Sequence, residues 1–256
     1  MTRWSRPFTL ALFLLWAAAP ARGEEIRVLT SGAFAAALGE LGPQFQQTTK
    51  IDVVVAEGGT LGSGPDTIPS RLARGEPVDV LIMSASALDD LIRAGKVEQA
   101  SRVDLGKSGI GLAVRAGTPH PDISTVDALR QTLLRAKSIA FSSSISGVYL
   151  STELFQKLGI ADQVLPKSKR IDVGRVGAAV ARGEAEIGFQ QKSELVTVPG
   201  IEYVGPLPEP VQRTTVFAAA IVRDAKNAAG AKRFIEFLTG PAARPSILRS
   251  GLDPVR

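Results

Sequence analysis

The stretch IRVLTSGAFAAALGELGPQFQQTTKIDVVV (26–55) contains two β-branched runs on either side of a segment with helical periodicity. The runs at 25–29 and 51–56 predict strands, because β-branched residues fit a pleated sheet. The segment 34–47 repeats apolar residues every three or four positions, which predicts an amphipathic helix. A strand, a helix and a second strand in this order form the unit that builds parallel sheets. This stretch therefore indicates an α/β fold.

The same alternation continues along the rest of the chain. Further strands are predicted at 78–83, 109–114, 138–141, 186–189, 201–204 and 214–222. Further helices are predicted at 86–95, 125–136, 147–159 and 228–240, with Ser86 and Thr125 as N-terminal caps of the first two.

The length of the chain and the lack of a linker predict two lobes. About 230 residues after the first two dozen suit two small lobes better than one open sheet. Since no flexible linker separates the lobes, strands are expected to cross between them. We predict one mostly parallel sheet flanked by helices in each lobe, with a ligand cleft between them. The first lobe would comprise 24–107 plus 216–256, and the second 108–215.

The N-terminus has the pattern of a secretory signal peptide. Positively charged MTRWSRP (1–7) precedes the apolar stretch FTLALFLLWAAA (8–19), and small residues follow at the expected cleavage site. We predict a cleaved signal peptide at 1–23 and export to a bacterial periplasm. The sequence contains no cysteine, which excludes a disulfide framework and a lipoprotein anchor.

The charge balance excludes a typical nucleic-acid binder. The whole chain has a net charge of +5, and Arg3, Arg6 and Arg22 of the predicted signal peptide contribute three positive charges with no acid, leaving 5 − 3 = +2. The remaining charges are interspersed and form no dense basic stripe. We expect a monomer without nucleic-acid partners.

Four loops that follow predicted strands are rich in hydroxyl groups, glycines and amides. Ligands of open α/β sheets bind beyond the carboxyl ends of the strands. The loops are TSGAF (30–34), EGGTLGSGPDTIP (57–69), SSSISG (142–147) and QQKSE (190–194). Each loop taken alone is typical of a plain helix cap, but together they indicate a cleft that binds a small anion through hydrogen bonds.

The predicted ligand-binding residues come from these four loops and from two nearby cations. Hydrogen-bond donors are expected from Ser31, Gly32, Gly59, Thr60, Ser143, Ser146 and Gln191. Lys192 and Arg213 would add positive charge, although solvated surface positions are an equally good interpretation for both.

Familiar catalytic motifs are absent from the sequence. The one histidine, His120, lies between two prolines in a predicted turn, and there is no cysteine or phosphate-binding glycine motif. Histidine-based triads and zinc sites are therefore disfavoured, and we expect neither a metal nor a cofactor. Glu57, which ends a strand beside the glycine-rich loop, is the carboxylate best placed to reach the cleft.

Three segments resemble a known family. They are 26–55, RLARGEPVDVLIMSASALDDLIRAGKV (71–97) and VGAAVARGEAEIGFQQ (176–191). They are similar to the type II periplasmic solute-binding proteins, and in particular to the molybdate-binding branch. The resemblance implies two α/β lobes joined by two crossing strands, closure on an anion, and an inner-membrane ABC permease as partner.

The sequence departs from the molybdate-binding pattern at three places. Ala33 occupies the position of a serine, the second loop is longer and glycine-rich, and Gln191 lies near the position of a tyrosine. These departures favour a larger, flatter anion such as a di- or tricarboxylate. Periplasmic aconitate isomerase is similar to the same family. The sequence thus favours a transport-linked binding protein, and the alternative is an isomerase with Glu57 as base and Tyr149 as acid.

Overall fold

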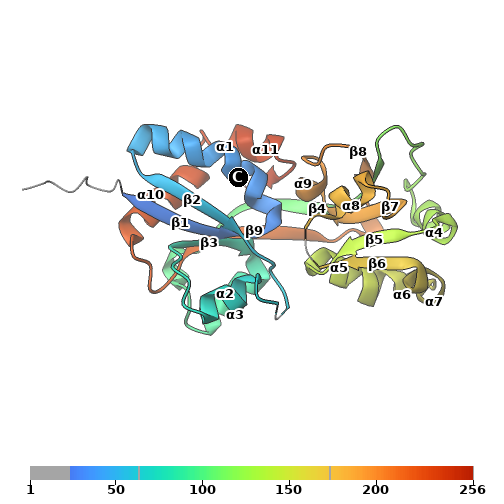
Figure 1. Cartoon of the computed structure of the whole chain (residues 1–256), viewed down its shortest axis with the longest axis horizontal. Helices are drawn as coiled ribbons and strands as arrows, with labels where there is room; N and C mark the ends of the chain where they lie inside the picture. The colour runs from blue at the N-terminus through green and yellow to red at the C-terminus, as the bar shows by residue number, and fades with distance from the viewer. Residues whose placement is uncertain (1–23, 63, 173, 256) are drawn as a thin grey trace, which may run out of the picture.

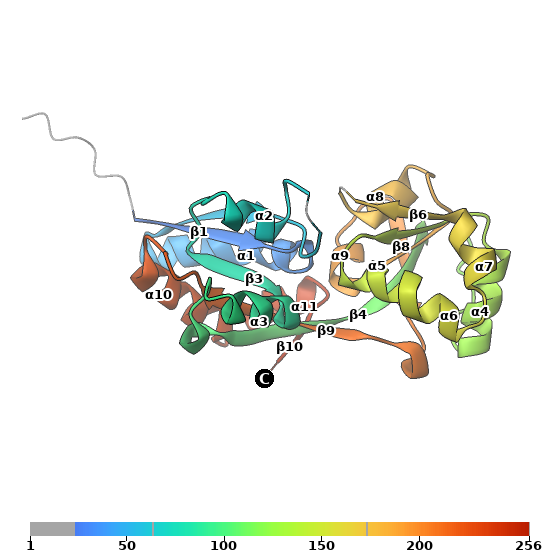
Figure 2. The ribbon, with the colours of Figure 1, turned by 90° about the horizontal axis from the view of Figure 1, so that it is seen from below.

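The computed structural model describes residues 24–62, 64–172 and 174–255. Its strands are β1 (Glu25–Thr30), β2 (Asp52–Glu57), β3 (Val80–Ser84), β4 (Val103–Arg115), β5 (Ile139–Ser142), β6 (Ser168–Ile171), β7 (Ile187–Gln191), β8 (Ile201–Pro206), β9 (Thr214–Ile221) and β10 (Asp253–Pro254). They form a mixed sheet in the order β2-β1-β3-β9-β4-β7-β5-β6, with β8 and β10 both paired to β4. Figures 1 and 2 show two lobes joined by β4 and β9. The predicted two-lobed α/β fold is confirmed.

The helices flank the sheet in both lobes. They are α1 (Gly32–Thr49), α2 (Ile68–Ala73), α3 (Ala85–Arg93), α4 (Val126–Arg135), α5 (Ile145–Tyr149), α6 (Phe155–Lys157), α7 (Ala161–Val164), α8 (Val176–Ala181), α9 (Lys192–Leu195), α10 (Ala228–Thr239) and α11 (Arg244–Arg249). A π-helical segment, Leu150–Leu154, joins α5 to α6, so that 145–157 is helical throughout. Figure 1 shows α1 and α11 on one side of the first-lobe strands and α2 and α3 on the other.

Both faces of the first-lobe sheet are buried. Along β1, Ile26 and Val28 join the core formed with α1, α10 and α11, whereas Leu29 joins the core beneath α2 and α3. Phe45 of α1 packs edge-on against Phe234 of α10, with ring centroids 5.0 Å apart. A sheet covered on both faces selects continuous apolar strands, which explains the apolar run of β3, whereas the edge strand β2 leaves Val54 and Val55 exposed.

Strand β4 belongs to both lobes. It pairs antiparallel with β9 from Val103 to Gly109, and then with β7 from Ile110 to Val114. Because its first part pairs with β9 and its second part with β7, β4 runs without a break from one lobe into the other. The predicted lobe boundaries at 107/108 and 215/216 fall within β4 and β9, and their exact positions stay a prediction.

The second lobe presents three parallel strand ends to the first lobe. Strand β5 pairs in parallel with β6 and β7, so that their carboxyl ends lie at the same edge. The buried rings of Phe155 and Phe189 belong to the core behind these strands. The loops after β5, β6 and β7 therefore face the loops after β1, β2 and β3 across the cleft between the lobes (Figure 2).

The predicted strands and helices are present, with local differences at their ends. The side chain of Thr125 accepts a hydrogen bond from the Ala128 N–H, which confirms that cap. The predicted cap at Ser86 is wrong, because α3 begins at Ala85 after Ser84. Strand β6, which the sequence analysis missed, ends the sheet order and reads SKRI, so it lacks an apolar run.

The predicted signal peptide at 1–23 lies outside the described residues. No helix in the described part of the chain is long and apolar enough to cross a membrane.

Candidate active site in the cleft between the lobes

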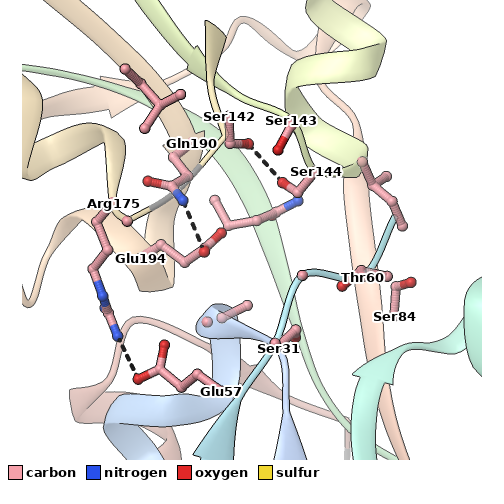
Figure 3. A pocket seen from close by; sticks show the side chains of 18 of the residues that line it. Ser31, Glu57, Thr60, Ser84, Ser142, Ser143, Ser144, Arg175, Gln190 and Glu194 are labelled. Atoms are coloured by element: carbon pink, nitrogen blue, oxygen red, sulfur yellow. Dashed lines mark hydrogen bonds and ion pairs between the residues drawn. The ribbon is translucent and has the colours of Figure 1, made fainter. Parts of the chain in front are cut away.

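A cleft of about 340 Å³ lies where the strand ends of the two lobes face each other. The first lobe contributes the loops after β1, β2 and β3, and the second lobe contributes the loops after β5, β6 and β7. Figure 3 shows side chains from both lobes converging on this space. The polar and charged lining residues are Ser31, Glu57, Thr60, Asp66, Ser84, Ser142, Ser143, Ser144, Asp172, Arg175, Gln190, Gln191, Glu194 and Thr215.

The first-lobe wall offers hydroxyl groups at the start of a long helix. Ser31 is the N-cap of α1, but its side chain makes no capping hydrogen bond. The hydroxyl oxygens of Ser31 and Ser84 are buried and have no hydrogen-bond partner among the described residues. The N-terminus of an α-helix carries partial positive charge and free N–H groups. This wall is therefore suited to receive a carboxylate group of a ligand.

The second-lobe wall contains a cluster of serines at the end of β5. The Ser142 hydroxyl lies 2.7 Å from the Ser144 hydroxyl and 3.3 Å from that of Ser146. Ser144 is the N-cap of α5 and also makes no side-chain capping bond. Gly147 is required for packing, because a Cβ atom there would lie 1.6 Å from the Ser142 carbonyl oxygen. The cluster thus turns Ser142, Ser143 and Ser144 toward the cleft and keeps Ser146 behind them.

A buried carboxyl group lies in the cleft wall. Glu194 of α9 is only 8% exposed, and its Oε1 accepts a hydrogen bond of 2.9 Å from Nε2 of Gln190. Burial raises the pKa of Glu194 to about 7, and the negative charge of Glu57 acts in the same direction. The positive charge of Arg175 and the Gln190 hydrogen bond act in the opposite direction. At neutral pH this carboxyl group is therefore divided between its acid and base forms.

Glu194 reaches across to the first lobe at a glycine. A Cβ atom on Gly32, the first residue of α1, would lie 2.6 Å from Oε1 of Glu194. A Cβ atom does not come so close to an oxygen atom that it is not bonded to, so a side chain at this position would displace the carboxyl group. Gly32, which was predicted to bind the ligand, thus leaves space for the carboxyl group of Glu194, which was not among the predicted site residues.

An ion pair joins the two lobes beside this carboxyl group. Arg175, the N-cap of α8, places a guanidinium nitrogen 3.4 Å from a carboxylate oxygen of Glu57 at the end of β2. The Glu57 side chain is 52% exposed, so water screens its charge. Arg175 is the one cation among the described residues that line the cleft. It is therefore the charged group available to a bound anion.

The structure brings together most of the predicted site residues. Ser31, Gly32, Glu57, Gly59, Thr60, Ser143 and Gln191 line the cleft. Ser146, Tyr149, Lys192 and Arg213 are not among its lining residues. The Tyr149 hydroxyl donates to the Val211 carbonyl oxygen, and Arg213 stacks on the Tyr149 ring and pairs with Glu153. Both side chains are thus occupied within the second lobe.

Sequence reasoning missed several residues of the cleft. They are Ser84, Ser142, Ser144, Arg175, Gln190 and Glu194. A signal was present in QQKSE, because this loop had already been identified as polar and contains both Gln190 and Glu194. Arg175 carried no such signal, because its partner Glu57 lies 118 positions away in the sequence.

Comparisons with known proteins agree with this architecture. The profile of a family described as bacterial extracellular solute-binding proteins matches residues 26–253. An aconitate isomerase from a Pseudomonas species is 44% identical over 230 residues, which cover 90% of this chain and 88% of that protein. The molybdate-binding protein ModA of Azotobacter vinelandii is 24% identical over 246 residues, covering 91% of this chain and 92% of that protein. The solved structure of the periplasmic molybdate-binding protein of A. vinelandii has a TM-score of 0.72 at 22% identity, covering 89% of this chain and 98% of that one.

Proposed function

Because this chain belongs to the bacterial extracellular solute-binding proteins, we propose that its cleft binds a small tricarboxylate and moves a proton along it, interconverting cis- and trans-aconitate. The aconitate isomerase that is 44% identical over 90% of the chain supports this substrate. The sequence analysis favoured a binding protein and kept the isomerase as the alternative. We reverse that order because a buried carboxyl group, Glu194, lies in the cleft wall.

Glu194 is the observation that carries the proposal. A protein that only carries an anion gains nothing from a buried carboxyl group in its binding wall, because the ionised form repels the ligand. A general base works best when its pKa lies near the operating pH, and burial raises the pKa of Glu194 to about 7. The same residue then accepts a proton from carbon and returns it.

The chemistry needs one acid–base group. Aconitate has a methylene carbon next to a carbon–carbon double bond. Ionised Glu194 removes a methylene proton, and the electron pair spreads over the three allylic carbons and their carboxylates. The protonated Glu194 then returns the proton to the former vinyl carbon, so that the double bond moves and no atom is gained or lost. The bound conformation about the former single bond sets the geometry of the new double bond.

The remaining lining residues hold the substrate carboxylates. Ser31 and Ser84 with the α1 N-terminus would bind one carboxylate, and the serine cluster beside α5 a second. Arg175 would bind a third by exchanging its long contact with Glu57 for the substrate. Hydrogen bonds to carboxylate oxygens would strengthen as charge develops there, which stabilises the transition state.

A second candidate function is supported by the two-lobed fold. The family profile and the ModA-like relative are compatible with a periplasmic protein that binds a small organic anion and delivers it to an inner-membrane ABC permease. Both candidates require export, which the predicted signal peptide would provide, and both use the same cleft without a cofactor.

Turnover separates the two candidates. Purified mature protein would be incubated with trans-aconitate, and the two isomers would be separated by chromatography over time. We expect cis-aconitate to accumulate until the ratio of the two isomers is constant. A reaction started from cis-aconitate should reach the same ratio. Binding in a calorimeter with no change of isomer at saturation would contradict the isomerase and support the binding protein.

A further inference from the structure

Gln190 connects the start of one helix to the buried carboxyl group. It lies at the end of β7 and is 3% exposed. Both the oxygen and the nitrogen of its side-chain amide make hydrogen bonds. The Val176 N–H in the first turn of α8 donates to its Oε1 over 3.0 Å. Its Nε2 donates to Oε1 of Glu194 over 2.9 Å. Figure 3 shows the hydrogen bond from the Gln190 amide to Glu194 as a dashed line.

The chemistry of the two partners fixes the orientation of this amide. A backbone N–H is a donor only, so it must face the amide oxygen of Gln190. The amide nitrogen is then forced toward Glu194, whose carboxylate form accepts hydrogen bonds only. Turning the amide over would place two donors against each other at Val176. The donor to Glu194 is therefore held in place by the main chain of α8.

We propose that Gln190 is a positioning residue, which holds Oε1 of Glu194 in the cleft wall and leaves Oε2 for the substrate. This inference rests on the proposed proton transfer and assigns one oxygen to it. Oε1 is engaged by Gln190 and lies close to Gly32. Oε2 accepts no hydrogen bond from any described residue. The carboxyl group thus presents a single oxygen to the reacting carbon.

Three groups around Glu194 control its ionisation. Arg175 on α8 favours the ionised form electrostatically, and Glu57 at the end of β2 opposes it. Gln190 favours the ionised form by donating a hydrogen bond. Because Gln190 is the one neutral group of the three, a neutral replacement such as leucine removes its hydrogen bond without altering the charge of the cleft.

Two variants of Gln190 test the proposal. Gln190→Leu removes the donor and keeps the bulk. We expect the pKa of Glu194 to rise by about one unit, since a hydrogen bond to a charged group is lost. At pH 7 kcat would fall about fivefold, with recovery at pH 9, because a smaller fraction of Glu194 is ionised. KM would change little.

Gln190→Glu retains an acceptor for the Val176 N–H but places a second carboxyl group beside Glu194. The pH dependence of kcat should therefore also shift to higher pH.

Carbon-13 NMR titration of the glutamate carboxyl signals gives a readout independent of turnover. The Glu194 signal is identified by its loss in Glu194→Gln, and melting curves report folding. The positioning role would be overturned if both variants kept the wild-type pKa of Glu194 and the wild-type pH dependence of kcat, and only their melting temperatures were lower. An upward shift of the Glu194 titration in both variants supports it. If the Glu194 titration shifts upward in both variants but the wild-type protein has no isomerase activity, the proposed function fails while the contact between the two residues stands.

Discussion

Replacing Glu194 with glutamine should make the protein more stable and inactive at the same time. The substitution is nearly isosteric, and the amide oxygen can still accept the hydrogen bond from Gln190. What it removes is the ability to carry a negative charge in a buried place. The size of the gain follows from the shift of the pKa of Glu194 from 4.5 in the unfolded chain to about 7 in the folded protein.

The sign of the effect is set by proton binding. Between pH 4.5 and 7 folded Glu194 holds a proton that the unfolded chain has released, so the free energy of unfolding falls as pH rises. Each unit of pKa shift corresponds to about 1.4 kcal/mol. The shift therefore costs the wild-type protein about 3 kcal/mol above pH 7, and almost nothing at pH 4. Glu194→Gln avoids this cost because its amide does not ionise.

Thermal unfolding at two pH values measures this difference. At pH 8 we expect Glu194→Gln to melt roughly 6–12 °C above the wild-type protein, since 1 kcal/mol corresponds to about 2–4 °C for a chain of this size. At pH 4 the two melting temperatures should coincide. Equal melting temperatures at both pH values would mean that Glu194 is not held in its acid form by burial, and the reasoning would fail.

Three further substitutions probe the cleft walls. Gly32→Ala should lower kcat by about 10²-fold or more, because its methyl group would displace the buried carboxyl group; Gly39→Ala in the same helix meets no atom within 4 Å and should keep full activity. Arg175→Gln should raise KM by about one to two decades in steady-state kinetics and change kcat less, since a charged hydrogen bond to the substrate is lost; an unchanged KM would exclude a role in binding. Ser143→Ala should weaken ligand binding in calorimetry by about one decade, whereas Ser146→Ala, which lies behind the wall, should lower the melting temperature and keep affinity. The opposite pattern for the two serines would refute this assignment.

The location of the cleft follows from local sequence patterns. Strand–helix alternation predicts parallel strands, and the carboxyl ends of parallel strands meet at one edge. Hydroxyl-rich loops after those strands therefore indicated a polar cleft, and Ser31, Thr60 and Ser143 do line it. These are short-range signals, because each loop directly follows the strand that positions it.

The chemistry of the cleft depends on contacts between distant segments. Buried Glu194 on α9 lies against Gly32 of α1, which is 162 positions earlier in the sequence, and no local pattern encodes that approach. Tyr149 illustrates the converse: a helix residue next to the serine loop was a candidate acid, but its hydroxyl donates to the Val211 carbonyl oxygen and its ring lies in the second-lobe core. Burial of a polar side chain is a property of the assembled fold, so sequence patterns could not predict it.

Proton NMR of cis-aconitate with the wild-type protein and with Glu194→Gln tests whether this carboxyl group performs the proton transfer. Both proteins would be used at the same concentration near pH 8, with calorimetry run in parallel to confirm that each binds the substrate. We predict that the vinyl signal of trans-aconitate appears with the wild-type protein and not with Glu194→Gln, although both bind. A Glu194→Gln protein that converts the substrate as fast as the wild type would contradict the assignment of Glu194 as the acid–base group.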